Sequence, residues 1–393
     1  MVHHTVVPSR RVRRALAAGL AATLLLGVTA CTDDPEPAGV GESGTSAPDG
    51  DACRPEELPE PIDPAAVADA DLDGTTVTLA THDSFAVSDG LFEDFTAETG
   101  IEVELVSAGD AGAMVSQAIL TAGDPVADVM FGIDTTFLCR GTAAGLFVPY
   151  APEALADVPD EYEIATDHLA TPIDVGDVCL NYSVEAYPDP ADAPQGLDDL
   201  TDPAFADAFV TENPETSSPG LAFLLATIAE YGADGWEDYW ADLRENGVEV
   251  TSGWTEAFED SFGSGAGSAE RSIVTSYASS PVVDVLYSDP PRDEAIIGVV
   301  PDACFRQVEL AGVLRGTDEP EAAARLVDFL LSPPFQEDIP LNMFVDPVNE
   351  TADLPEEYTA HSVTIDEPLT LTPAEIEEGR DAWTERWTEI VLR

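Results

Sequence analysis

The sequence contains no lysine, and its basic residues are 15 arginines, against 77 aspartates and glutamates. The formal net charge is −62 at pH 7, and the acidic residues are spread along the whole chain. Such a surface repels a phosphate backbone, which argues strongly against a nucleic-acid-binding protein. The charge alone does not identify a ligand. Attraction of a cationic ligand is one explanation, but solubility or tolerance of salt explains better a charge that is spread along the whole chain.

Long apolar runs are also lacking. The run Ala15–Val28 is too short to form a stable membrane anchor, and it follows the positively charged residues Arg10, Arg11, Arg13 and Arg14. It leads into Val28–Cys31, an aliphatic residue, two small residues and a cysteine, which is the pattern for lipidation at Cys31 and cleavage before it. An ordinary secretory signal with a chance cysteine is the alternative. No second spanning segment follows, so we do not expect the chain to be a permease.

The segment after Cys31 has almost nothing to bury. Residues 32–52 are mainly Asp, Pro, Gly, Ser and Glu, a composition typical of a flexible tether. We therefore expect a signal peptide over residues 1–30, then a lipidated Cys31 and a tether over residues 31–74. This arrangement predicts a protein held by a lipid anchor on the extracytoplasmic face of the cell membrane.

Cysteine is scarce, with five in the chain. Once Cys31 is assigned to lipidation, Cys53, Cys139, Cys179 and Cys304 remain, and an even number in an exported protein favours two disulfides. Their spacing has no CxxC element, so we expect no zinc site. Of the three pairings that four cysteines allow, we favour Cys53–Cys139 and Cys179–Cys304. The first would hold the start of the ordered region to the body, and the second would join two β-like segments.

Strand and helix patterns alternate from Thr75 onward. They predict strands, helices and strands in the order 75–81, 91–99, 101–107, 111–122 and 126–133. This β-α-β-α-β order predicts a parallel sheet with helices on both faces. Because ligands bind beyond the carboxyl ends of such strands, we expect His82–Phe85 and Asp134–Thr136 to lie at one mouth.

A second α/β unit follows the first. Further β-like segments occur at residues 177–182, 209–212, 248–251, 273–276, 296–300 and 305–314. The segment Thr216–Gly220 places Ser and Thr before a Pro, which predicts a helix running to about Glu230. Helices are also expected at Glu319–Leu331 and around Trp383 and Trp387. The pattern predicts a two-lobed α/β clamshell with a hinge, in which residues 75–178 and 304–393 form one lobe and residues 179–303 the other.

The chain from Thr75 to its end resembles the thiamine-binding proteins of ABC importers, within the type II periplasmic binding protein superfamily. The resemblance rests on the order and spacing of Thr81–Phe85, Ala127–Asp134, Pro172–Gly176, Thr216–Leu221, Thr251–Ala257, Thr275–Pro281, Gln307–Glu309, Leu331–Gln336 and Pro340–Val348. It implies a monomer that captures thiamine or a thiamine phosphate and delivers it to an ABC transporter permease. It implies neither a cofactor nor an enzymatic activity.

The resemblance also implies an aromatic site. Trp254 and Tyr277 fall where the family has aromatic walls around its ligand. Thiamine joins a flat aminopyrimidine to a charged thiazolium, so the face of a Trp offers both stacking and cation–π attraction. Core packing is the alternative, but Gly253 and the polar residues around Trp254 indicate a loop.

Polar residues complete the implied site. Asp83, Asp134 and Asp174 resemble cleft positions, where a carboxylate accepts from the pyrimidine amino group or balances the thiazolium. Surface solvation is the alternative for each of them. The remaining positions, Ser217, Ser218 and Gly220, match a phosphate-facing segment in which the N–H groups of a helix start would hold a phosphate. Simple N-capping is the alternative there.

The chain departs from the family at several aromatic positions. His82 stands where the family has a Tyr, and Phe344 stands where it has a Trp. We expect both of them, together with Ser84, to be ligand-binding residues. Val175 and Val283 stand where aromatics are common. The implied site therefore has fewer aromatic side chains than the sites of the family. A related pyrimidine or thiazolium compound is for this reason an alternative ligand.

Two other functions are alternatives. Ferric-iron-binding relatives use clustered tyrosines, and Tyr277 has no Tyr beside it in the sequence. An exported hydrolase would need a triad converging from separate segments, which the adjacent residues Thr81–Ser84 cannot form. The run Gly263–Gly267 lacks the G-x-S-x-G spacing and is expected to be a flexible loop. We therefore expect a binding protein without a metal site.

Overall fold

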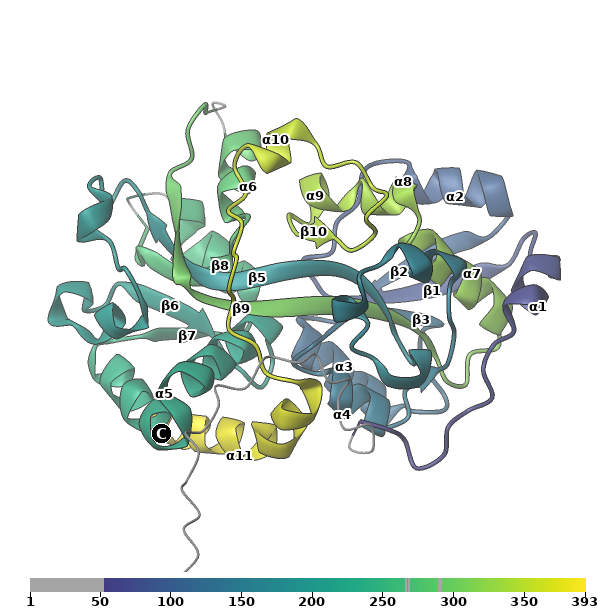
Figure 1. Cartoon of the computed structure of the whole chain (residues 1–393), viewed down its shortest axis with the longest axis horizontal. Coiled ribbons are helices and arrows are strands. Elements are labelled where there is room, and N and C mark those ends of the chain that lie inside the picture. Colours follow the sequence, from purple (N-terminus) through teal and green to yellow (C-terminus); the bar gives the residue numbers. More distant parts are fainter. Residues whose placement is uncertain (1–52, 266, 268, 289–291) are drawn as a thin grey trace, which may run out of the picture. The chain divides into compact units, whose positions relative to one another are not determined.

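The computed structural model describes residues 53–265, 267, 269–288 and 292–393, all of which belong to one compact unit (Figure 1). The expected signal peptide, Cys31 and residues 32–52 lie outside the described residues. Within the described part of the chain, no helix has the length and apolarity needed to cross a membrane.

A mixed sheet runs through the middle of this unit, with the strand order β2-β1-β3-β9-β5-β8-β6-β7. The expected parallel β-α-β-α-β segment is confirmed: β1 (Thr76–Thr81) pairs in parallel with β2 (Glu102–Ser107) and with β3 (Val129–Asp134). The connecting helices are α2 (Leu91–Thr99) and α3 (Ala111–Leu120). The alternation of strand and helix patterns was therefore sufficient to locate this segment.

Two long antiparallel strands, β5 (Thr171–Ser183) and β9 (Ile297–Leu314), occupy the centre of the sheet (Figure 1). The two short strands expected over 296–300 and 305–314 are parts of β9, and the one expected over 177–182 is the second half of β5. The expectation of two separate strands over 296–300 and 305–314 was wrong. An irregularity in the pairing with β5, between Val178 and Leu180, lets β9 continue through Pro301 and Asp302.

The other side of the sheet carries β6 (Phe209–Glu212), β7 (Glu249–Thr251) and β8 (Ile273–Tyr277). Helix α5 spans Ser218–Glu245 and passes beyond the predicted end near Glu230. Gly232 interrupts it with a φ of 67°, a left-handed conformation that glycine adopts freely. The helix resumes because Trp236, Tyr239 and Trp240 on its second part are buried.

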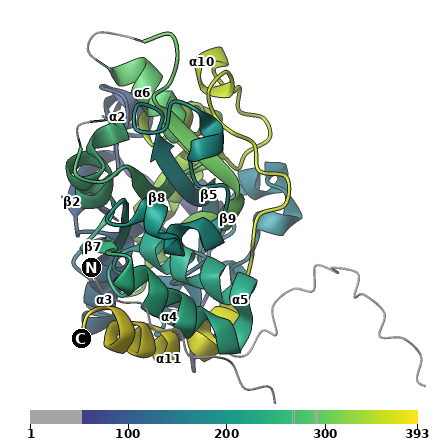
Figure 2. The same cartoon turned by 90° about the vertical axis from the view of Figure 1, so that its left-hand side faces the viewer.

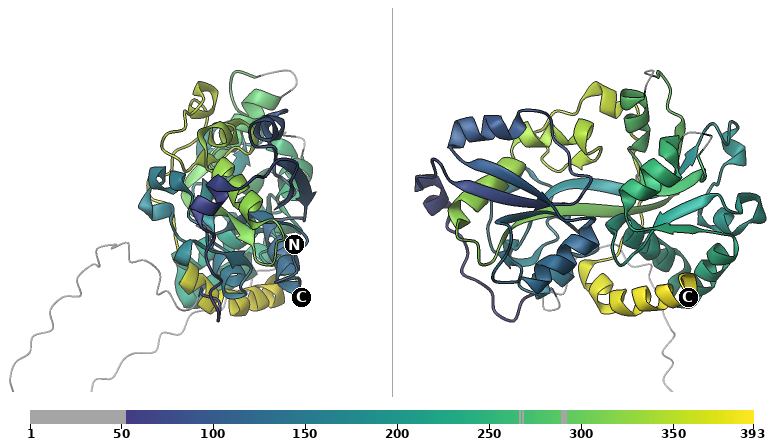
Figure 3. Two further views of the ribbon diagram at one scale, coloured as in Figure 1. Left: turned by 90° about the vertical axis from the view of Figure 1, so that its right-hand side faces the viewer. Right: turned by 180° about the vertical axis from the view of Figure 1, so that it is seen from behind.

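Shorter elements complete the chain. Helices are α1 (Pro64–Asp69), α4 (Leu138–Ala143), α6 (Ser280–Tyr287), α7 (Pro320–Leu330), α8 (Pro333–Gln336), α9 (Ile339–Asn342), α10 (Glu356–Thr359) and α11 (Pro373–Val391), and strands are β4 (Phe147–Val148) and β10 (Asp346–Pro347). Helix α11 packs against α5 and α4 (Figures 2 and 3). Its Trp387 is fully buried, with its ring centroid 5.4 Å from that of Trp240 in an edge-to-face arrangement.

Two large apolar clusters support the sheet. One includes Val77, Phe131 and Leu326, from β1, β3 and α7, and the other includes Leu224 and Trp387, from α5 and α11. The cluster with Leu224 and Trp387 also contains Ala80, Met114 and Ile133, from β1, α3 and β3, so the two clusters do not divide the chain into the expected lobes. The lobe boundaries at Cys179 and Cys304 stay a prediction.

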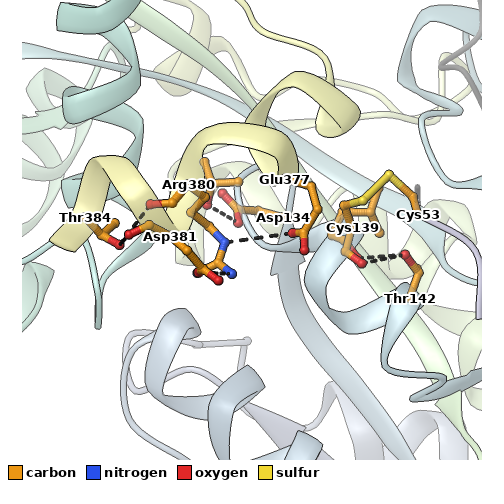
Figure 4. Close-up of polar contacts among 10 residues, drawn as sticks. Cys53, Asp134, Cys139, Thr142, Glu377, Arg380, Asp381 and Thr384 are labelled. Carbon is orange, nitrogen blue, oxygen red and sulfur yellow. Dashed lines mark hydrogen bonds and ion pairs between the residues drawn. A yellow bond between two sulfur atoms is a disulfide. The ribbon is translucent and has the colours of Figure 1, made fainter. Parts of the chain in front are cut away.

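The disulfides of the structure are Cys53–Cys139 and Cys179–Cys304, which is the pairing that the sequence analysis favours. Cys53–Cys139 joins the start of the described chain to α4, near the Arg380 ion pairs of α11 (Figure 4). Cys179–Cys304 joins β5 to β9 beside the irregularity in their pairing.

Candidate functional site

A cavity of about 400 Å³ opens where several loops and helix starts meet. It is lined by the loop after β1, by the starts of α3 and α5, by residues after β7 and β8, and by the loop before β10. This place agrees with the expectation that His82–Phe85 lies at a mouth beyond the strand ends. The other expected loop, Asp134–Thr136, does not reach the lining.

Aromatic side chains form part of the wall. Trp254 is half-buried and stacks on Phe258, with ring centroids 4.8 Å apart and an interplanar angle of 13°. The indole Nε1 of Trp254 donates to Ser276 Oγ at 2.9 Å, which fixes the ring. Tyr277 and Phe344, which are predicted to bind the ligand, also line the cavity. Phe258 was not expected, although it lies four residues after Trp254 in the same short helical segment.

His82 links the loop after β1 to the sheet. Its Nδ1 is 2.9 Å from Ser84 Oγ, and its Nε2 is 3.5 Å from Glu309 Oε1. Burial lowers the pKa of His82, but the carboxylates of Glu309, Asp110 and Asp83 outweigh burial, so that the pKa is raised. The His82 ring lies close to β3, and Gly132 allows this because a Cβ there would lie 2.6 Å from the ring. His82, Ser84 and Asp83 all line the cavity.

Three carboxyl groups form a row across neighbouring strands at the base of the cavity. Glu309 of β9 is the register partner of Asp134 in β3 and of Asp174 in β5, so the three side chains lie on one face of the sheet. Glu309 lines the cavity, whereas Asp134 and Asp174 are fully buried behind it. Asp134 and Asp174 are therefore close to the cavity without lining it.

The buried carboxyl groups of this row are poorly satisfied. Thr136 Oγ1 donates to Asp134 Oδ1 at 2.7 Å, but the Oδ2 atoms of Asp134 and Asp174 have no hydrogen-bond partner among the described residues. Burial raises the pKa of Asp134 to about 7, and the charge of Glu309 adds to the effect. Burial, followed by Glu309, also raises the pKa of Asp174 well above its usual range. A positive charge in the cavity would relieve this repulsion.

The expected phosphate-facing segment is only partly at the cavity. Ser218 lines it, and its Oγ accepts from Gln307 Nε2 at 2.8 Å. Ser217 lies behind the lining and is fully buried. Gly220 packs on β6, where a Cβ would meet the Glu212 carbonyl oxygen at 2.5 Å. The N-cap Ser217 makes no side-chain capping hydrogen bond.

Sequence reasoning missed three acidic residues of the lining, Asp110, Glu259 and Glu309. Asp110 precedes α3, where it signals only an N-cap. Glu309 stands inside an apolar strand, and that position was the available signal, since a charged residue among apolar strand residues needs a reason. Asn342, Ser279 and Ser280 also line the cavity and carried no such signal.

Comparison with known proteins supports a solute-binding role. The family model of the bacterial extracellular solute-binding proteins matches residues 124–367. The thiamine-binding periplasmic protein of Escherichia coli (strain K12) is 30% identical over 325 residues, which cover 81% of this chain and 94% of the relative. The protein of the same name from Brucella suis biovar 1 (strain 1330) is 28% identical over 324 residues, covering 81% and 92%.

Solved structures agree with this relationship. A periplasmic thiamin binding protein superposes with a TM-score of 0.71 at 27% identity, covering 81% of this chain and 96% of that one. Iron-bound HitA from Pseudomonas aeruginosa superposes with a TM-score of 0.66 at 24% identity, covering 80% and 99%, and shares the fold. The fold is that of the type II periplasmic binding proteins, and the chain belongs to the family of bacterial extracellular solute-binding proteins.

Proposed function

We propose that the protein captures thiamine outside the cytoplasm. The observation that carries this proposal is the row Asp134–Glu309–Asp174 at the base of a cavity walled by Trp254. The cavity volume of about 400 Å³ lies in the range of small-molecule sites. The names of the relatives in Escherichia coli and Brucella suis point to the same ligand.

The chemistry of the cavity suits an aromatic cation. The face of Trp254 offers stacking to the aminopyrimidine and cation–π attraction to the thiazolium. Glu309 supplies a negative charge from the base, and Asp83 supplies one from the rim. The carboxylates of the site repel one another when the cavity is empty. A cation bound beside them offsets this repulsion and so lowers the free energy of the site.

Native mass spectrometry of the mature protein from its own host tests this proposal. We expect a co-purifying mass equal to that of thiamine or a derivative. Ferric iron is the rival cargo, because iron-binding proteins share the fold. A tyrosinate–iron absorbance band in place of an organic ligand would overturn the proposal. Ferric-iron-binding relatives use clustered tyrosines, whereas Tyr277 is the single tyrosine among the described lining residues, which favours the organic ligand.

We further propose that Cys31 anchors the protein by a lipid so that it can hand its cargo to an ABC transporter permease. The support is the sequence pattern at residues 10–31. We expect Cys31→Ser to release the protein from the membrane fraction into the soluble fraction or medium. Immunoblotting of fractionated cells measures this. A variant that stays on the membrane would contradict the lipid anchor, whatever the ligand.

A further inference from the structure

His82 is the one group in the described part of the cavity lining that can carry a positive charge. The other titratable groups of that lining are Asp83, Asp110, Glu259, Tyr277 and Glu309. No arginine belongs to the described lining, and the two other histidines of the described chain, His168 and His361, lie outside it. A cationic ligand therefore enters a cavity in which the protein supplies a single competing cation of its own.

The imidazole of His82 is held between two side-chain oxygen atoms. Its Nε2 lies 3.5 Å from Glu309 Oε1, and its Nδ1 lies 2.9 Å from Ser84 Oγ. The ring also packs beside Phe131, with ring centroids 5.7 Å apart. Because Glu309 lines the cavity as well as pairing with His82, a cation in the cavity and the imidazole draw on the same carboxylate.

Negative groups surround His82. Burial is the largest single influence on the pKa of His82 and lowers it. Three carboxylates together outweigh burial and raise this pKa above its usual value of 6.5, namely those of Glu309 on β9, Asp110 before α3 and Asp83 on the same loop. The other register partners of Glu309, Asp134 on β3 and Asp174 on β5, are buried behind it. In the empty site, His82 is therefore more than half protonated at pH 6.5.

We propose that His82 is an internal cation that neutralises Glu309 in the empty site and gives up a proton when a cationic ligand takes that carboxylate. The proton leaves Nδ1 for solvent, and the hydroxyl of Ser84 then donates to this nitrogen. Capture of the ligand is thereby coupled to the release of up to one proton. This inference rests on the proposed capture of thiamine and adds a proton to its binding equilibrium.

Proton release makes the affinity for thiamine depend on pH in one direction. A cation beside Glu309 lowers the pKa of His82 in the complex relative to the empty site. At a pH above the pKa of the empty site, His82 is neutral in both states and thiamine binds at full strength. Below that pKa, which lies above 6.5, binding must expel a proton, so the dissociation constant rises by up to about tenfold per pH unit.

Calorimetric titration of the mature protein with thiamine at about pH 6 and about pH 8.5 tests the proposal. We expect the dissociation constant of the wild type to be on the order of tenfold larger at the lower pH. Repeating the titration in two buffers of different ionisation enthalpy counts the protons released. His82→Gln places an uncharged N–H donor near the position of Nε2, and it should lose most of this ratio and of the proton release.

Two control variants isolate the contribution of His82. Asp134 titrates at about 7 and lies beside Glu309, so the comparison is repeated in Asp134→Asn, where the difference between His and Gln at position 82 should persist. His168→Asn removes an exposed histidine outside the lining, and Asn tolerates the left-handed backbone there, with a φ of 52°. Its ratio between the two pH values should equal that of the wild type.

NMR titration of the histidine ring signals reads the proton directly. The His82 signal is assigned by elimination with His168→Asn and His361→Asn, so this measurement does not depend on the folding of His82→Gln. We expect the pKa of His82 to lie above 6.5 in the free protein and to fall by about one unit or more with saturating thiamine. Glu309→Gln should lower the pKa of His82 in the free protein.

The possible outcomes separate the two proposals. If the wild type binds thiamine but the pKa of His82 is the same with and without it, the role of His82 is overturned while thiamine capture stands. The same conclusion follows if folded His82→Gln keeps the wild-type ratio between the two pH values. If the wild type binds no thiamine at either pH, thiamine capture fails, and the inference fails with it.

Discussion

Replacing Trp254 with alanine should weaken thiamine binding by about five- to more than a hundredfold, which corresponds to about 1–3 kcal/mol. The loss combines apolar contact with cation–π attraction. Trp254 is only half-buried, so its removal should change the melting temperature little. A Trp held mainly in the core would instead cost about 3–5 kcal/mol of folding stability on truncation. Calorimetric titration and thermal melting measure the two effects separately.

Matched variants make the Trp254 result interpretable. Trp254→Phe keeps an aromatic face next to Phe258 and should retain most of the affinity. Trp383→Ala removes a Trp of α11 that lies outside the cavity lining, and it should leave the affinity unchanged. Unchanged affinity in Trp254→Ala, or loss of its fold, would assign Trp254 to the core.

The second large effect concerns the pH dependence of stability. Because burial raises the pKa of Asp134 from its usual value to about 7, the folded protein holds this proton where the unfolded chain has released it. The contribution of Asp134 to the free energy of unfolding is therefore fully present below about pH 4. It is lost as the pH rises to about 7. At roughly 1.4 kcal/mol per pKa unit, the loss has an upper bound of about 4 kcal/mol.

The variant Asp134→Asn should remove the part of the pH dependence of stability that Asp134 contributes. Asparagine is uncharged and can still accept from Thr136 Oγ1. We expect the variant to match the wild type near pH 4 and to be more stable by up to a few kcal/mol at pH 8. Urea unfolding at intervals between these values measures the difference. Glu98→Gln, an exposed control on α2, should follow the wild-type curve. A constant difference between Asp134→Asn and the wild type would show that Asp134 does not titrate in this range.

Local patterns predicted most of the regular structure. The strand Phe209–Glu212 and the helix Leu91–Thr99 have the bounds that alternation and helical periodicity indicated. These signals depend on neighbours within a few residues, so they can be read without the tertiary structure. The end of α5 and the continuity of β9 could not be read in this way. Gly232 and Pro301 look like breaks locally, and buried packing and strand pairing carry the chain past them.

The sequence by itself determined the sign of the charge, the alternation of strands and helices, and the resemblance that singled out Trp254 and Tyr277. The tertiary structure decided which of the 77 acidic residues matter to the cavity. Glu309 meets Asp134 and Asp174 only through the register of three strands, and Asp110 meets Ser218 and Trp254 across 108 and 144 positions of the chain. Strand register and helix packing are set by the burial of apolar side chains over the whole unit, and no local pattern around a single carboxylate carries that information.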